Sequence, residues 1–274
     1  MNNADFLLFN LAIAFGVLST AGYLLSLFLK RVALARISTW ILLASFALMT
    51  VTLLLSVSKE AGLINPGRRD FFLFCAWSVA GIYLALQLKT KTRVLGAFVT
   101  PLILLLQIAA AAQQTGTVLV PADMQNSLTL VHLILAVAGE ALFALASLAG
   151  LIYLIQNSNL KRAKFDSLIR LLPSLNDLER INRICLLWGF SFLTAGLISG
   201  VAFAGAAWQA GWYADPKIIW TFGVWVVYGF LLHQRLAIGW RGARMARLSV
   251  AAFVVFVITY WLIKICFATI HDFI

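Results

Sequence analysis

Long apolar runs constrain this chain more than any other feature of its sequence. A membrane-spanning helix needs roughly 20 mainly apolar residues, and eight stretches meet that condition. Hydrophobic residues make up 62% of the sequence and charged residues 11%, whereas a soluble domain is about half apolar and a quarter charged. We therefore predict an all-α, polytopic transmembrane bundle that forms a single integral membrane domain over residues 1–274. The predicted spans are 5–29, 37–58, 70–88, 95–113, 128–155, 184–207, 217–237 and 248–270.

The basic residues predict how the bundle lies in the membrane. With the N-terminus outside, 16 of the 21 lysines and arginines fall in loops on the inner side. Cytoplasmic loops carry an excess of these residues, so we predict both termini outside. The net charge of +11 is explained by this topology. The sequence has no basic stripe with interleaved aromatic residues, so we do not expect a nucleic-acid partner. The expected surroundings of the chain are membrane lipid. The absence of a transit peptide favours a bacterial inner membrane.

A tryptophan-rich segment between two apolar runs is the most unusual local feature. It reads WQAGWYADPKIIWTFGVW over residues 208–225. Indole rings prefer the boundary between hydrocarbon and water, so the cluster predicts a platform at the membrane surface. Asp215 before Pro216 is typical of a helix N-cap followed by proline in the first turn. Capping explains these two residues but not the tryptophans around them. Those tryptophans are Trp208, Trp212, Trp220 and Trp225.

Three histidines are candidates for chemistry. The predicted topology places His132 and His271 near the outer side, with the tryptophan-rich segment. His233 follows Lys217 by 16 residues, about 24 Å along its span at 1.5 Å per residue, which places it near the inner face. Two imidazoles suit the axial positions of haem, and indole rings can cover its edge. The alternative is that His132 and His271 are ordinary interfacial histidines. For His233, a structural role and a functional role both stay open.

Two further features lie within the predicted spans, and one lies in a loop. Glu140 follows His132 by eight positions on the same helix face; it is either a hydrogen-bonded packing residue or a group that tunes a ligand or a proton path. Gly196 and Gly200 are spaced so that a neighbouring helix can approach closely, a packing role that needs no ligand. The inner loop 156–183 carries apolar residues at helical spacing, which predicts a short amphipathic helix on the inner membrane face.

The C-terminal half resembles a known family, the haem-handling cytochrome c assembly proteins that include CcsA, CcmC and HemX. Their tryptophan-rich segment reads approximately W-G-x-Y-W-x-W-D-P-K-E-x-W. The runs SLTLVHLILAVAGEALFALASLAGLIYL and TFGVWVVYGFLLHQR are similar to the helices that flank it, and they bring in His132 and His233. The resemblance covers about 127–274, whereas 1–126 match only in hydropathy. The residues that fit the segment are Trp208, Trp212, Asp215, Pro216, Lys217 and Trp220.

Four positions depart from the family pattern. Gln209, Gly211, Ala214 and Ile218 stand where the family has Gly, Tyr, Trp and Glu. These departures thin the aromatic surface. The sequence DPKIIW, together with the modest length of the chain, is most similar to the HemX-type branch.

The resemblance implies a haem-binding membrane protein of cytochrome c biogenesis that presents non-covalent haem b at an outer-face platform. This role is transfer and chaperoning rather than bond-making catalysis. It implies His132 and His271 as axial ligands of the haem iron, and His233 as an inner relay site shared with a CcsB-like or other membrane partner. The implied platform residues are Trp208, Trp212, Asp215 and Trp220. Two alternatives are a HemX-like regulator that binds a haem-biosynthesis enzyme, and a structural subunit of a membrane complex without haem.

Overall fold

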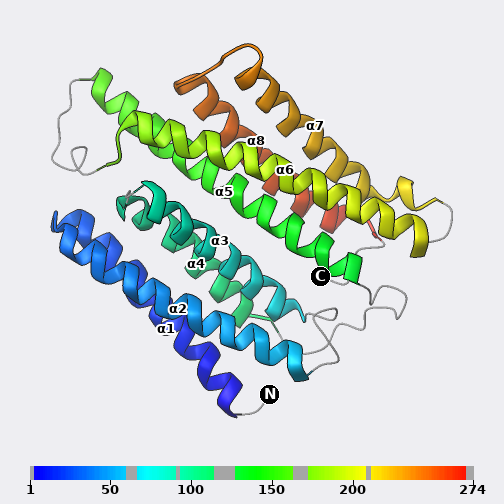
Figure 1. The fold of residues 1–274 in the computed structure, drawn as a ribbon, viewed down its shortest axis with the longest axis horizontal. Helices are drawn as coiled ribbons and strands as arrows, with labels where there is room; N and C mark the ends of the chain where they lie inside the picture. Colours follow the sequence, from blue (N-terminus) through cyan, green and yellow to red (C-terminus); the bar gives the residue numbers. More distant parts are fainter. Residues whose placement is uncertain are drawn as a thin grey trace. The chain divides into compact units, whose positions relative to one another are not determined.

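Helices account for most of the computed structural model, which describes residues 3–59, 67–90, 93–113, 127–162, 172–207 and 211–269. Within these ranges the chain forms eight α-helices and no strand, which confirms the all-α prediction (Figure 1). The helices are α1 (Asn3–Phe28), α2 (Val32–Lys59), α3 (Arg68–Thr90), α4 (Gly96–Ala111), α5 (Ser127–Lys161), α6 (Leu175–Ala207), α7 (Pro216–Leu236) and α8 (Ala243–Cys266). Two short 3-10 turns are η1 (Arg93–Leu95) and η4 (Trp212–Ala214).

Seven of the described helices are long and apolar enough to cross a membrane. The helix outside this set is α7, whose 21 residues carry Lys217 in the first turn and His233 and Arg235 in the last. These polar ends lower its mean hydropathy. The side of the membrane on which each terminus lies stays a prediction.

Helix α6 begins earlier than the sequence predicts. Its first residue is Leu175 rather than residue 184, because Ser174 caps the helix by accepting a hydrogen bond from the backbone N–H of Asp177 at 3.1 Å. The first two turns are charged, so hydropathy alone does not include them. The predicted amphipathic helix falls mainly on residues 163–171, which lie outside the described residues.

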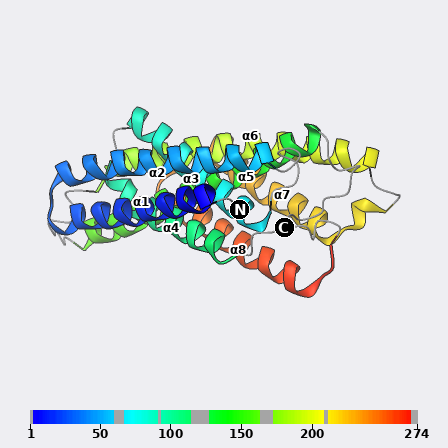
Figure 2. The same cartoon turned by 90° about the horizontal axis from the view of Figure 1, so that it is seen from below.

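The chain divides into two compact units, and each is described by itself. Unit 1 comprises Met1–Val118 and Ile155–Asp177. In it, α1 packs against α2 and α4, and α3 packs against the same two helices, as two views show (Figures 1 and 2). Unit 2 comprises Leu119–Leu154 and Leu178–Ile274, and it holds most of α5 and α6 with all of α7 and α8. That the whole chain acts as one domain stays a prediction.

A buried glutamine on α4 forms hydrogen bonds with two other helices of unit 1. Gln107 on α4 donates from Nε2 to the carbonyl oxygen of Ala12 on α1 at 3.3 Å and to Ser45 Oγ on α2 at 3.1 Å. Gly16 makes room for this side chain, because a Cβ at that position would collide with Gln107 Oε1. Hydrogen bonds between buried polar groups therefore fix the register of three helices.

Small residues let α5 and α6 approach closely in unit 2. A Cβ on Gly139 would lie 3.2 Å from the backbone of Gly189 and of Leu193 on α6. A Cβ on Gly196 would lie 3.3 Å from the backbone nitrogen of Ala136 on α5. The predicted packing role of Gly196 is thus confirmed, and its neighbour is α5.

A buried ion pair joins the four helices of unit 2 near the end of α7. Arg235, which is 7% exposed, lies 3.3 Å from Glu179 Oε1 and donates to Asn182 Oδ1 at 3.3 Å, both on α6. Asn182 Nδ2 donates to the carbonyl oxygen of Ala146 on α5 and to Ser249 Oγ on α8, each at 2.8 Å. This cluster therefore links α5, α6, α7 and α8 to one another.

Candidate functional site

His132 is held in a defined orientation in the second turn of α5. Its Nδ1 lies 2.7 Å from the carbonyl oxygen of Gly196 on α6. A carbonyl oxygen can only accept a hydrogen bond, so Nδ1 must carry the proton. In the neutral ring Nε2 then holds a lone pair, and Nε2 has no hydrogen-bond partner among the described residues. Metal-binding histidines commonly donate their second N–H to a backbone carbonyl in this way.

Gly200 provides the space in which the imidazole lies. A Cβ at Gly200 would be 2.7 Å from His132 Nδ1 and 2.8 Å from its Cε1, closer than such atoms pack. The two glycines therefore form a slot, in which Gly196 supplies the hydrogen-bond acceptor and Gly200 the room. Sequence reasoning noted the glycines and the histidine separately and missed that they form one site. Recognising this site requires knowing which residues of α5 lie opposite which residues of α6, and no sequence motif gives that information.

Helices α5 and α7 run in the same direction. The ammonium group of Lys217, in the first turn of α7, is close enough to His132 to act on it electrostatically. Eleven residues further along each helix, Phe143 of α5 stacks on Tyr228 of α7 with ring centroids 3.5 Å apart. The equal spacing places the beginnings of both helices at the same end of unit 2. His132 lies at this end, which we call the pocket end.

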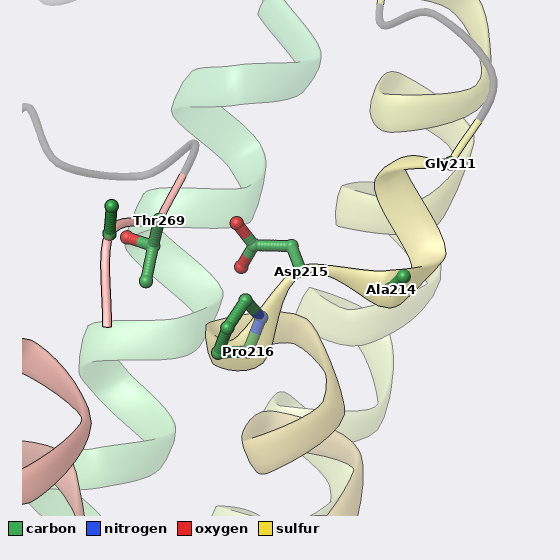
Figure 3. A pocket seen from close by; sticks show the side chains of 6 residues that line it. Gly211, Ala214, Asp215, Pro216 and Thr269 are labelled. Carbon is green, nitrogen blue, oxygen red and sulfur yellow. The ribbon is translucent and has the colours of Figure 1, made fainter. Parts of the chain in front are cut away.

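An open cavity of about 450 Å³ lies at the pocket end, where α7 begins and α8 ends. Figure 3 shows the Asp215 carboxylate pointing into it, with Thr269 opposite and α5 passing behind in pale green. The position of Thr269 after α8 was not predicted, because no motif marks it. The lining residues are Gly211, Ala214, Asp215, Pro216, Ala268 and Thr269.

The predicted N-cap at Asp215 is confirmed. Its Oδ1 accepts hydrogen bonds from the backbone N–H of Lys217 at 2.9 Å and of Ile218 at 3.3 Å. Gly211 precedes this turn with φ +103°, a left-handed conformation that glycine adopts without strain. Gly211 therefore has a backbone role here. One wall of the cavity is fixed by these local contacts.

The predicted aromatic platform is described only in part. Trp212 lies in η4, partly buried. Trp220 donates from Nε1 to Thr259 Oγ1 at 2.8 Å and stacks on Phe256 of α8 at 5.1 Å, so its ring is engaged in holding α7 to α8. Trp208 lies outside the described residues. The platform as a whole stays a prediction.

The other two histidines are not brought together with His132 by the described part of the chain. His233 lies in the last turn of α7 with its side chain exposed, far from the pocket end. His271 lies outside the described residues; in sequence it follows Thr269, which lines the cavity, by two positions. A second axial ligand at His271 and a relay at His233 stay predictions.

The helices are long enough to span a membrane, and the end of unit 2 that holds the cavity also holds the available imidazole nitrogen of His132. These features define a multi-pass membrane protein with a candidate metal-binding histidine. Comparison with known families places it more closely: the chain belongs to the cytochrome C assembly protein family, which matches residues 68–271. The match begins in α3, earlier than the resemblance noted from about residue 127, and it includes all three histidines. The predicted family and the multi-pass membrane location are confirmed, whereas the HemX-type branch and the bacterial inner membrane stay predictions.

Several relatives carry the name cytochrome c biogenesis protein CcsA. The protein from Heterosigma akashiwo is 32% identical over 232 residues, which cover 70% of this chain and 70% of the relative. The protein from Porphyra purpurea is 27% identical over 293 residues, with 90% and 91% covered. The protein from Chlamydomonas reinhardtii is 29% identical over 238 residues, with 83% of this chain but 64% of the relative covered. The chain therefore spans just under two thirds of the length of that last relative.

Proposed function

We propose that this chain binds and passes on haem at the pocket end of unit 2 as part of cytochrome c biogenesis. The observation that carries the proposal is the hydrogen bond from His132 Nδ1 to the Gly196 carbonyl oxygen. It leaves Nε2 available at the end of the unit that holds the cavity. The family, and relatives named for cytochrome c biogenesis, support the process in which this site acts.

The described donor at the pocket end, His132 Nε2, is of a kind that binds the iron of a non-covalent, b-type haem. Imidazole nitrogen is a common ligand of haem iron. His132 would hold the iron together with His271, as the sequence predicts. Trp208 and Trp212 would cover the macrocycle, which is flat and apolar and packs well on indole rings. The protein contributes binding and orientation, so its role is transfer rather than catalysis.

A partner is part of the same proposal. His233 is exposed at the end of α7 opposite the cavity, where a second membrane protein can contact it. The relay function of His233 therefore depends on a subunit such as a CcsB-like protein. Loss of His233 should affect transfer in the assembled system and leave haem binding at the pocket end to His132.

A haem titration of variants tests the assignment of His132. We expect His132→Ala in detergent to bind haem at least about 10-fold more weakly, because an axial ligand matters no less than the groups that orient it. Added imidazole should restore the low-spin spectrum by occupying the vacated coordination position. The matched control is Ile134→Ala, which removes a 43% exposed apolar side chain two residues away and should bind like the wild type.

An unchanged spectrum and affinity in His132→Ala would contradict the ligand assignment. A protein that never binds haem but captures a haem-biosynthesis enzyme would favour the regulatory alternative. These two outcomes are distinguishable, because the first concerns one residue and the second concerns the wild-type chain.

A further inference from the structure

Two polar side chains inside unit 2 lie near each other without a direct hydrogen bond. Tyr228 on α7 is 2% exposed, and its Oη has no hydrogen-bond partner within the described ranges. Glu140 on α5 is partly buried and also forms no hydrogen bond or ion pair there. The Glu140 carboxyl group nevertheless acts electrostatically on the Tyr228 hydroxyl. The stacking of Phe143 on Tyr228 brings the same two helices together.

The packing of the two helices supports this placement. Phe143, one turn after Glu140 on α5, stacks on the Tyr228 ring at 3.5 Å with an interplanar angle of 12°. Residues three apart share a helix face, so Glu140 faces α7 as Phe143 does. Side chains on helices lean toward the N-terminus, and α5 and α7 run in parallel. The Tyr228 hydroxyl is therefore directed toward the turn of α5 that carries Glu140.

Both groups lie deep in their helices. Glu140 is 12 residues beyond Leu128, where its span begins, and Tyr228 is 12 residues beyond Pro216, which is about 18 Å in each case. At this depth an unpaired hydroxyl and a charged carboxylate are both costly. Buried polar groups nearly always have a protein or water partner. A donor and an acceptor that face each other without contact are bridged by water in many proteins.

Within the described ranges, the ion pairs found do not involve Glu140. Lys217, in the first turn of α7, acts on the Glu140 carboxyl group electrostatically. His132 lies two turns earlier on α5, and its Nδ1 proton is engaged with Gly196. The charged side chains of α6 and α8 lie near the helix ends, at Asp177, Glu179, Arg180, Arg183, Arg244, Arg247 and Lys264.

We propose that Glu140 and Tyr228 hold a water molecule between them and that the pair is a proton-exchanging site inside unit 2. The carboxyl group is the neutral acid and donates its proton to the water, which is also hydrogen-bonded to Tyr228 Oη. Exchange moves the acid proton of Glu140 to the water and returns one from it, with no other bond broken. The site is distinct from the cavity at the pocket end and does not depend on bound haem.

Infrared spectroscopy of the purified wild-type protein and its variants tests the proposal. A protonated carboxyl group gives a C=O stretching band separate from that of a carboxylate. We expect this band in the wild type, its downshift in D₂O because water reaches the proton, and its loss in Glu140→Gln. Tyr228→Phe keeps the ring stacked on Phe143 and removes only the hydroxyl, so the band should move. The control Tyr153→Phe, on α5 but outside the pair, should leave the band in place.

Several outcomes would overturn the proposal. One is that the wild-type protein lacks the C=O stretching band of a protonated carboxyl group, or that this band persists in Glu140→Gln. Another is that the frequency of the band is the same in D₂O as in H₂O, or the same in Tyr228→Phe as in the wild type. If Glu140→Gln does not fold, Tyr228→Phe carries the test with a second measurement. Removing a water-bonded hydroxyl should lower the thermal midpoint, whereas removing an unpaired buried hydroxyl should raise it.

Discussion

Replacing Gly200 by alanine perturbs the slot that holds His132 without touching the histidine itself. The new methyl group would lie 2.7 Å from His132 Nδ1 and 2.8 Å from Cε1. Non-bonded heavy atoms pack at about 3.5 Å or more, so the ring must move by roughly 0.8 Å. A movement of this size away from α6 stretches the 2.7 Å contact with the Gly196 carbonyl oxygen beyond the range of a good hydrogen bond.

The magnitude follows from three terms. The lost hydrogen bond costs about 1 kcal/mol net, and the overpacked contact costs about 1–3 kcal/mol. The better helix propensity of alanine returns up to about 1 kcal/mol. Gly200→Ala should therefore lower the free energy of unfolding by about 1–3 kcal/mol. Because Gly196 orients a proposed metal ligand, haem affinity should fall about 10- to 100-fold.

Gly205→Ala is the matched control, because it adds the same methyl group to the same helix. Nothing lies within 4 Å of a Cβ at Gly205, so only the propensity term applies, and this variant should be neutral or up to about 1 kcal/mol more stable. Thermal unfolding in detergent and haem titration of both variants measure the difference. Equal midpoints and equal affinities for Gly200→Ala and Gly205→Ala would refute the reasoning about the slot.

Three further predictions concern stability and are measured by thermal unfolding in detergent. Gly16→Ala should destabilise the protein by about 1–3 kcal/mol, because the methyl group collides with Gln107 Oε1; a wild-type midpoint would show that Gln107 can move freely. Glu179→Gln should cost about 3 kcal/mol by leaving the buried Arg235 without its counter-ion, and adding Arg235→Met should recover part of the loss; strictly additive effects would exclude a coupled pair. Asp215→Ala should lower the free energy of unfolding by about 1 kcal/mol through the lost cap. Asp215→Asn should keep most of the wild-type stability, because its side-chain oxygen can still accept the capping hydrogen bonds. Equal losses in the two variants would point to the charge rather than the hydrogen bonds.

Local patterns predicted much of the fold. Apolar length located the helices, and the dipeptide at Asp215 and Pro216 predicted a cap that the structure confirms, because capping depends on neighbours in the chain. The start of α6 was predicted too late, since Leu175 follows a polar cap and two charged turns that hydropathy does not register.

The site could be predicted only in part, because its geometry depends on how the helices pack against one another. His132, Gly196 and Gly200 are 64 and 68 residues apart in sequence, and no spacing rule connects a histidine on one helix with a carbonyl on the next. The ion pair between Arg235 and Glu179 could not be predicted from the sequence for the same reason. A candidate ligand could therefore be named from the sequence, whereas the groups that orient it required the packed helices.

An absorption spectrum shows whether the pocket end binds a haem through His132. The wild-type protein, purified in detergent after expression with sufficient haem, is measured oxidised and then reduced, with a pyridine haemochrome assay for stoichiometry. We expect low-spin, b-type bands at about one haem per chain, the spectrum of two imidazole ligands. A clean apoprotein under these conditions would contradict this expectation.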